Sequence, residues 1–342
     1  MATTFKTLNS ANDVTSTRTL LHEAIPLTGT IASGTYTDDN IKTYSHGMFE
    51  SVYDYPYLSS SANHIFDITT GYASNSALSG AASIQNSKKL NIYSQMAQVL
   101  VGYDATGSIQ SFDRDGDIAS GGDKINEAIF VNFSRLLTKD EMKKGSFTMS
   151  VMTGGAPETV SDVMTIADHG AADAYKVNSP AGEYGILYSG SAATAGEEVG
   201  LVYYQAGVVV LTGSVFAASQ LGNGDLVDTG YSAMATGSNI EMMADSFRNR
   251  LQNVSFNNTV ELNSTVYFCR ASHNEFNYSN NPTYLSDSQI RVKNSTTDNP
   301  VSYVTTVGLY SSDNELLAVA KLSEPLKKDP STEVTLRVRL DF

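Results

Sequence analysis

The segment from Ser45 to Asp67, SHGMFESVYDYPYLSSSANHIFD, contains side chains from which a hydrolase site could be built. Its 23 residues include two histidines, three carboxylates, five aromatic rings and several serines. A serine nucleophile needs a histidine as its base, and His46 or the His22–Glu23 pair could in principle serve one. Because serine is frequent throughout the chain, proximity in the sequence says little about such pairs. The segment is therefore either a catalytic site or a surface that another protein binds.

Familiar catalytic motifs are absent from the sequence. It contains neither G-x-S-x-G nor H-E-x-x-H, and its glycines form neither a P-loop nor a G-x-G-x-x-G motif after a strand-like run. A carboxylate pair for glycoside cleavage has no fixed spacing, so this alternative stays open. We therefore predict that the chain is not an enzyme and has no catalytic residues.

The best metal-binding pattern is DRDGD, in which Asp113, Asp115 and Asp117 occupy alternate positions. Oxygen ligands with this spacing suit calcium. An EF-hand loop would have glycine at its sixth position and an acid at its twelfth, where this chain has Ile118 and Lys124. A polar turn is favoured over a calcium loop, and we predict no metal and no cofactor.

The composition limits the classes of partner. A net charge of −14 argues against nucleic acid, because phosphate binding needs a basic patch and the only clustered cations are three lysine doublets. The longest nearly apolar run, VGLVYYQAGVVVLTG, is shorter than the roughly 20 residues that cross a bilayer, and the N-terminus lacks a signal-peptide pattern. The single cysteine, Cys269, excludes an internal disulfide and lies in an apolar run typical of a buried, inert thiol. We expect a protein made in a reducing cytoplasm, with neither nucleic acid nor membrane as partner.

Helical periodicity of apolar residues occurs in residues 86–103, 123–137 and 238–254. Ser238 and Glu241 form a capping box at the start of the third helix. A second capping box, TKDE, predicts a short helix from 138 that Gly145 ends. The predicted buried face of the first helix consists of Ile92, Met96, Val99, Leu100 and Tyr103.

Strand patterns dominate the rest of the chain. VGLVYYQAGVVVLTG predicts a hairpin that turns at residues 205–207. Residues 302–310, 315–322 and 333–342 alternate in polarity and predict antiparallel strands joined by turns. The first 75 residues, in contrast, suggest irregular structure broken by proline and glycine.

Together these elements predict an α+β fold that is β-rich, with a few amphipathic helices. We expect an N-terminal arm and a helical or mixed core in residues 1–150. An inserted small β domain rich in Gly, Ala and Ser should follow in 151–237. Residues 238–342 should form a helix followed by a C-terminal antiparallel β-sheet or sandwich.

Two loops rich in aromatic residues, Asn and Ser are candidate interfaces. Rings with polar tips are favoured at the centres of protein interfaces, because they bring a large contact area at a low cost in conformational entropy. Each segment could equally be an ordinary loop that packs on its own domain. The candidate interface residues are Tyr53, Tyr55, Tyr57 and Leu58 in the first loop and Phe276, Tyr278 and Tyr284 in the second.

Several longer segments resemble the virion structural proteins of tailed bacteriophages. TTVGLYSSDNELLAVAKLSEPLKK resembles a hairpin of phage tail and baseplate-attachment proteins. YDYPYLSSSANHIFD, LNIYSQMAQVLVGYD, KINEAIFVNFSRLL and FCRASHNEFNYSNNPTYL are similar to segments of such proteins in T4-like marine and cyanobacterial myoviruses. The resemblance covers roughly residues 1–150 and 238–342, whereas 151–237 match nothing that we know.

The resemblance implies a non-enzymatic structural component of a contractile-tail virion, in the baseplate or at a tail end. A neck, collar or head-vertex protein is the alternative within this class, and a tail-associated glycan-binding or glycan-cleaving module is the alternative outside it. We expect the protein to be assembled into the virion in the host cytoplasm. Its partners would be other virion proteins and further copies of itself.

Overall fold

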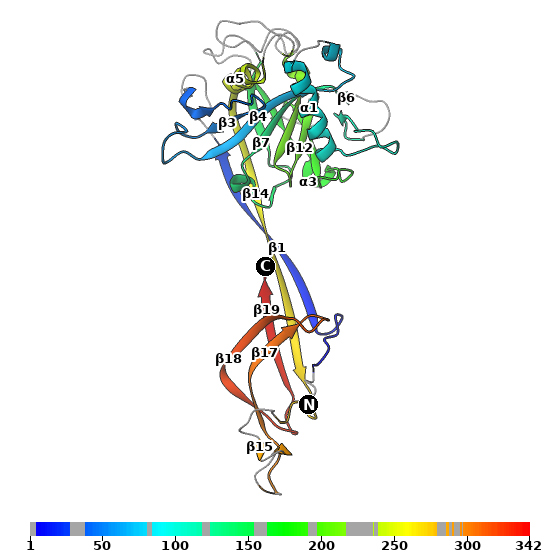
Figure 1. Ribbon diagram of the computed structural model, residues 1–342, viewed down its shortest axis with the longest axis vertical. Coiled ribbons are helices and arrows are strands. Elements are labelled where there is room, and N and C mark those ends of the chain that lie inside the picture. Colours follow the sequence, from blue (N-terminus) through cyan, green and yellow to red (C-terminus); the bar gives the residue numbers. More distant parts are fainter. Residues whose placement is uncertain are drawn as a thin grey trace. The chain divides into compact units, whose positions relative to one another are not determined.

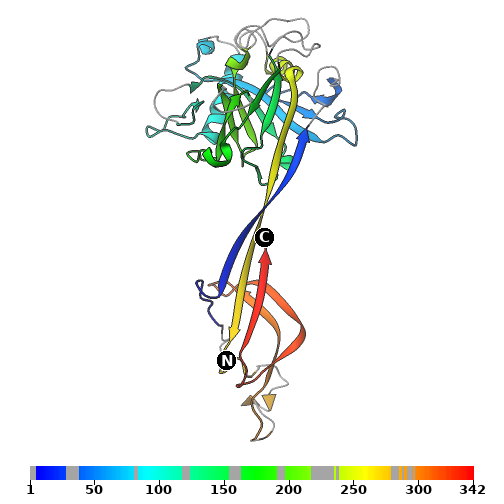
Figure 2. The same ribbon diagram turned by 180° about the vertical axis from the view of Figure 1, so that it is seen from behind.

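The computed structural model describes residues 5–27, 38–80, 84–117, 124–153, 163–190, 197–216, 235, 239–278, 285–286, 289–290, 295 and 297–342. The chain divides into two compact units: unit 1 comprises residues 1–20 and 261–342, and unit 2 comprises residues 21–260. Strands β1 (Val14–Leu27) and β14 (Leu251–Ala271) contribute residues to both units (Figures 1 and 2). The prediction of a β-rich α+β fold is confirmed.

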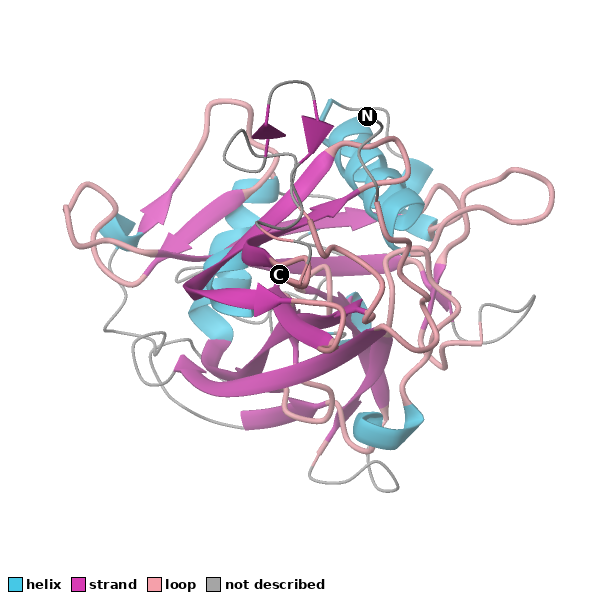
Figure 3. Ribbon diagram, turned by 90° about the horizontal axis from the view of Figure 1, so that it is seen from below, coloured by secondary structure: helices cyan, strands magenta, loops and turns pink. Residues whose placement is uncertain are grey.

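Unit 2 is built on one antiparallel sheet, whose order begins with β1 and the first part of β14. The order continues through β9 (Thr148–Met152), β10 (Val163–Ala167), β11 (Tyr184–Ser189), β12 (Glu198–Tyr203), β13 (Val208–Thr212), β7 (Glu127–Phe133), β4 (His64–Tyr72), β3 (Glu50–Tyr53) and β2 (Ile41–Lys42). The short strand β8 (Glu141–Met142) also pairs with β14, and β5 (Phe112–Asp113) pairs with β6 (Lys124–Ile125). The helices that the structure describes over their full length in this unit are α1 (Ile84–Leu100), α2 (Arg135–Thr138), α3 (Ala171–Ala174) and α5 (Ile240–Arg250) (Figure 3). Short 3-10 turns occur at Asp38–Asn40, Ala77–Gly80 and Gly213–Phe216.

Both faces of this sheet are buried. Ile129 and Val131 of β7 belong to one hydrophobic cluster, which also contains Phe247 of α5. Their neighbours Ala128 and Phe130 belong to a second cluster, to which α1 contributes Ile92, Tyr93, Ala97 and Leu100. Because successive side chains of a strand point to opposite faces, a strand in this position must be apolar at nearly every residue.

This two-sided burial explains an incorrect helix prediction. Residues 123–137 contain β6, β7 and the short α2 rather than one helix. A continuous apolar run matches the helical template at some positions whatever its true conformation. The short helix predicted to end at Gly145 is also wrong, because β8 occupies residues 141–142. The irregular start is a third error, since β1, β3 and β4 lie within the first 75 residues.

Two other helices are confirmed with corrections. In α1, Ile92 and Leu100 are buried, but Val99 is 65% exposed and Tyr103 lies beyond the end of the helix. In α5 the residue that caps the first turn is Asn239, whose side chain accepts a hydrogen bond from the Met242 backbone amide; Ser238 lies outside the described residues. The helix ends at Arg250, and the rest of the predicted helix is the start of β14.

The predicted hairpin at 199–213 is confirmed by the antiparallel pairing of β12 with β13. The domain boundaries differ from our prediction. Strands β10 to β13, all within 151–237, are hydrogen-bonded members of the sheet that also contains β7 and β4. These residues therefore belong to unit 2 together with most of the N-terminal region, since backbone pairing joins segments that composition alone separates.

Unit 1 contains the second part of β14, the first part of β1, and β19 (Val334–Asp341). Residues 264–271 of β14 pair antiparallel with β19. Strands β17 (Ser302–Tyr310) and β18 (Leu316–Lys328) form a separate hairpin, and β15 (Leu285–Ser286) pairs with β16 (Gln289–Ile290). The predicted C-terminal strands are thus present, although β19 pairs with β14.

Unit 1 buries little apolar surface within its described residues. There, the only buried apolar side chains are Val266 and Val338, each 8% exposed. Both hydrophobic clusters of the described chain consist of residues of unit 2. The strands of unit 1 therefore form without the core that stabilises unit 2.

Candidate functional site

The segment 45–67 forms the β3–β4 hairpin and the loop that joins its strands. Ser51 pairs with Asp67 and Tyr53 with His64, with a register shift between Val52 and Tyr53. The Asp54 carboxylate holds the loop closed, because it accepts hydrogen bonds from the Asn63 backbone amide at 2.6 Å and from its side-chain amide at 2.8 Å. The loop is thus a defined structure anchored on the sheet of unit 2.

The tyrosines beyond Tyr53 do not lie in an extended strand. Strand β3 ends at Tyr53, and residues 54–61 form successive bends and turns. The Tyr53 ring is half-buried and lies 6.4 Å from the Tyr57 ring and 5.5 Å from the His64 ring, measured between centroids. Burial raises the pKa of the Tyr53 phenol.

The residues beyond Tyr53 are the exposed part of the loop. The exposed fractions are 57% for Tyr55, 37% for Tyr57 and 85% for Leu58. These three side chains could contact a partner, and the prediction that they do so stands as a prediction.

The structure brings Ser51, His64 and Asp67 together, which sequence reasoning missed. Asp67 Oδ1 accepts a hydrogen bond from Ser51 Oγ at 2.5 Å and lies 2.8 Å from His64 Nε2. Tyr44 OH lies 3.2 Å from Ser51 Oγ. His64 and Asp67 are three residues apart on β4, and in a regular strand their side chains would point to opposite faces. The register shift next to Tyr53 lets both side chains lie on the same face. Nothing in the sequence marks that shift.

This trio has the wrong order for nucleophilic catalysis. In a serine hydrolase the imidazole lies between the serine and the carboxylate, so that it can take the serine proton. Here the carboxylate of Asp67 lies between Ser51 and His64. Ser51 is also only 3% exposed, so a substrate carbonyl cannot reach it. The arrangement can hold the base of the loop in place, but it does not activate a nucleophile.

His46 also has structural partners rather than catalytic ones. Its ring stacks on Tyr44 at 5.1 Å between centroids and lies 5.0 Å from the Phe49 ring. Its Nδ1 accepts a hydrogen bond from the Met48 backbone amide. Both histidines of the segment are therefore accounted for by local packing.

The DRDGD segment brings three carboxylates together. Asp113, Asp115 and Asp117 each offer one oxygen within 4.8 Å of the others, and no other three histidines, cysteines or carboxylates of the described residues lie so close together. Asp113 pairs with Lys124 across β5 and β6, and the Lys124 ammonium binds its carboxylate. Burial raises the pKa of Asp113, which Lys124 counteracts. The side chain of this lysine already supplies the positive charge that a metal ion would bring.

The second aromatic loop follows β14 in unit 1. Phe276 has a positive φ of 52° and is 43% exposed, and Tyr278 is 51% exposed. The fully buried Lys328 side chain holds the loop by donating hydrogen bonds to Asn277 Oδ1 at 2.8 Å and to the His273 carbonyl at 3.3 Å. Tyr284 lies outside the described residues. The loop is therefore fixed on unit 1, with two of its predicted interface rings exposed.

The comparisons with known proteins give no relative. No protein-family model matches the chain, and no curated protein and no solved structure matches it significantly. Among the described residues, no helix combines the length and the hydropathy needed to cross a bilayer.

Proposed function

We propose that this chain is a non-enzymatic structural protein of a contractile-tail phage virion, located in the baseplate or at a tail end. It acts by burying surface against other virion proteins and against copies of itself. The resemblance of its segments to such proteins motivates the proposal.

The observation that carries this proposal is the exposed apolar surface of unit 1. A unit of this size normally stabilises itself by burying apolar side chains in a core of its own. In the described part of unit 1, large apolar side chains are instead 38–76% exposed at twelve positions. They are Phe5, Leu20, Leu262, Phe276, Tyr278, Tyr303, Tyr310, Leu316, Leu317, Val319, Leu326 and Phe342. Exposed apolar surface of this extent is typical of proteins that bury it in an assembly.

The geometry of segment 45–67 supports a role without catalysis. Its serine, histidine and carboxylate are close enough for chemistry, but their order and the burial of Ser51 suit a structural hydrogen-bond network. The exposed rings Tyr55 and Tyr57 remain as contact residues in this view.

The test is the location of the protein in purified particles of a phage that encodes it. Particles are separated into tails and heads, and peptides of this chain are quantified in each fraction. We expect the protein in the tail fraction. Its presence in heads or at the neck would correct the location, and its absence from intact particles would refute the proposal.

A further inference from the structure

One face of the β17–β18 hairpin carries a contiguous group of exposed apolar side chains. Gly308 pairs with Val319 and Tyr310 with Leu316, and a bulge places Leu317 as an additional residue beside this pair. Directly paired residues of antiparallel strands lie on the same face. The exposed fractions are 46% for Tyr310, 52% for Leu316, 68% for Leu317 and 51% for Val319.

The absence of a side chain at Gly308 lets its neighbours fold over the backbone. A Cβ atom at Gly308 would lie 2.9 Å from the Tyr310 ring and 3.3 Å from Leu316 Cδ1. The Phe5 ring packs edge-on against Tyr310 at 4.9 Å between centroids and is itself 46% exposed. The next residue, Lys6, anchors this segment through a 2.6 Å ion pair with Glu275. We call Phe5, Tyr310, Leu316, Leu317 and Val319 the hairpin patch.

Charge favours a second copy of the chain as the partner of unit 1. Residues 1–20 and 261–342 contain ten Lys and Arg residues and eleven Asp and Glu residues, a net charge of −1. Residues 21–260 contain twelve and twenty-five, a net charge of −13, which accounts for the rest of the total of −14. Copies that meet through unit 2 repel one another, whereas copies that meet through unit 1 do not.

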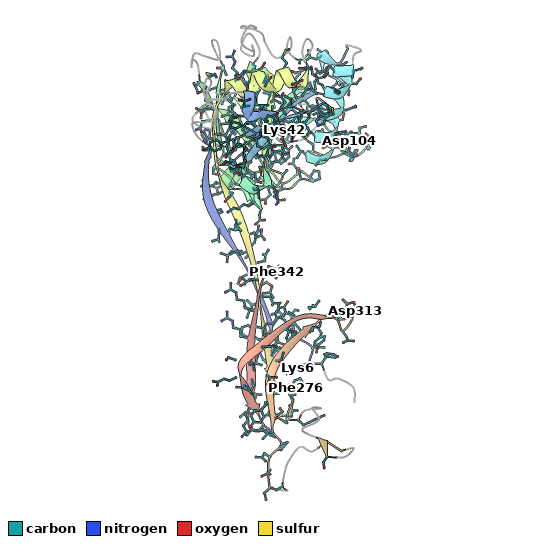
Figure 4. All side chains as sticks on the ribbon, turned by 60° about the vertical axis from the view of Figure 1, so that its left-hand side comes forward. Lys6, Lys42, Asp104, Phe276, Asp313 and Phe342 are labelled. Carbon is teal, nitrogen blue, oxygen red and sulfur yellow. The ribbon has the colours of Figure 1, made fainter. Side chains whose placement is uncertain are left out.

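The charges beside the hairpin patch are arranged so that the patch can bind its own copy. Asp313 and Glu315 lie in the turn at one end of the patch, and Figure 4 shows Asp313 at this turn. Lys321 pairs with Thr306 at the other end, two residues beyond Val319 and therefore on the same face. All three side chains are exposed, and none forms an ion pair within the described residues. An isologous two-fold contact, in which the two patches run antiparallel, brings each acidic turn to the lysine of the other copy.

We propose that the hairpin patch binds the hairpin patch of a second copy of this chain, with Asp313 and Glu315 of each copy facing Lys321 of the other. This inference rests on the proposed structural function and identifies the partner at one of its interfaces. Burial of the patch would supply the apolar contact that unit 1 lacks alone, and the charge pairs would fix the antiparallel register.

The experiment measures the mass of the purified full-length chain by sedimentation equilibrium between about 1 and 100 µM, where a dimer with a Kd of about 1 µM or below is the main species over most of the range. We expect a dimer. Val319→Asp should weaken dimerisation at least tenfold, while Val163→Asp, at a position of unit 2 that is 46% exposed, should leave it unchanged. Far-UV circular dichroism of both variants confirms that they fold.

A charge-reversal pair tests the register. Lys321→Glu alone and the double variant Asp313→Lys, Glu315→Lys should each weaken self-association at least tenfold, and an equimolar mixture of the two should form heterodimers. A wild-type monomer at 100 µM, assembly into an odd number of copies, or a mixture that fails to associate would overturn the inference. A wild-type monomer that is nonetheless found in tails would refute only this contact, whereas a dimer that is absent from particles would refute only the proposed function.

Discussion

Glu50 provides the sharpest test of the energetics of unit 2. Glu50 lies on β3 and is 2% exposed, and one oxygen of its carboxyl group has no hydrogen-bond partner. Three charged side chains of α5 face it: Asp245, with which it shares a hydrogen bond, Glu241 and Arg248. Desolvation is the largest cause that raises the pKa of Glu50, followed by the negative charges of Asp245 and Glu241; together they raise it from 4.5 to about 9, and Arg248 counteracts them.

The raised pKa of Glu50 sets the sign of a pH effect on stability. Between pH 4.5 and 9 the folded chain keeps the Glu50 proton, whereas the unfolded chain loses it. Stability therefore falls as the pH rises through this window. At about 1.4 kcal/mol per pH unit, holding the proton at pH 7 costs roughly 3 kcal/mol, because pH 7 is about 2.5 units above the unfolded pKa.

Glu50→Gln should remove this cost, because the amide is neutral at every pH and can still donate a hydrogen bond to Asp245. The free energy of unfolding is measured by urea denaturation at pH 5.5, 7.0 and 8.5. The variant should exceed the wild type by about 1, 3 and 5 kcal/mol at these three pH values. Glu197→Gln, at an exposed position, is the control and should follow the wild type. Equal slopes for Glu50→Gln and the wild type, or a variant less stable at pH 7, would show that Glu50 is ionised in the fold and paired with Arg248.

Three further substitutions test other parts of the chain. Asp168→Ala should lower the free energy of unfolding by about 3 kcal/mol or more, because the Tyr204 hydroxyl and the backbone amides of Gly145 and Phe147 lose their buried acceptor. The control, Asp173→Ala on the exposed surface, should change the urea midpoint little. Met96→Asp should prevent soluble expression, since Met96 packs against the second hydrophobic cluster and a carboxylate there costs several kcal/mol; normal expression would show that this face of α1 is solvated. Tyr55→Ala combined with Tyr57→Ala should leave the far-UV circular dichroism spectrum unchanged while incorporation into particles is lost, and normal incorporation would make 54–63 an ordinary loop.

The sequence predicted correctly those elements whose apolar pattern is compatible with only one type of secondary structure. The hairpin of β12 and β13 has strongly apolar strands on either side of a turn with a glycine at positive φ, Gly207, and few other structures share that signature. The strands β17, β18 and β19 alternate in polarity, which only a β period explains. The helix prediction for residues 123–137 is wrong because the burial of β7 on both faces removes the alternation that identifies a strand.

The polar network around Asp67 could not be predicted, for a different physical reason. It depends on a register shift of one residue in the β3–β4 pair, and such a shift is a property of two strands and their turn together. The exposure of Tyr55 and Leu58 is likewise decided by the Asp54–Asn63 contacts that close the loop. The residue types of this candidate site were visible in the sequence, whereas their geometry was not.

The two units differ in how far their strands bury their apolar side chains. In β7 the side chains on both faces of the strand are buried, because unit 2 covers the sheet on each side with its own helices and strands. In β19 the apolar residues Val334, Leu336, Val338 and Leu340 alternate with exposed polar residues, yet only Val338 is buried in the described unit. Strand β19 pairs with β14 over eight residue pairs, and its other three apolar side chains are half-buried. Leu316, Leu317 and Val319 of β18, in contrast, are more than half exposed. Apolar side chains that stay exposed in the folded chain stabilise the fold further only when another surface covers them. Contact between copies through the hairpin patch is therefore expected to raise the unfolding midpoint of unit 1 with protein concentration, while the midpoint of unit 2 stays constant.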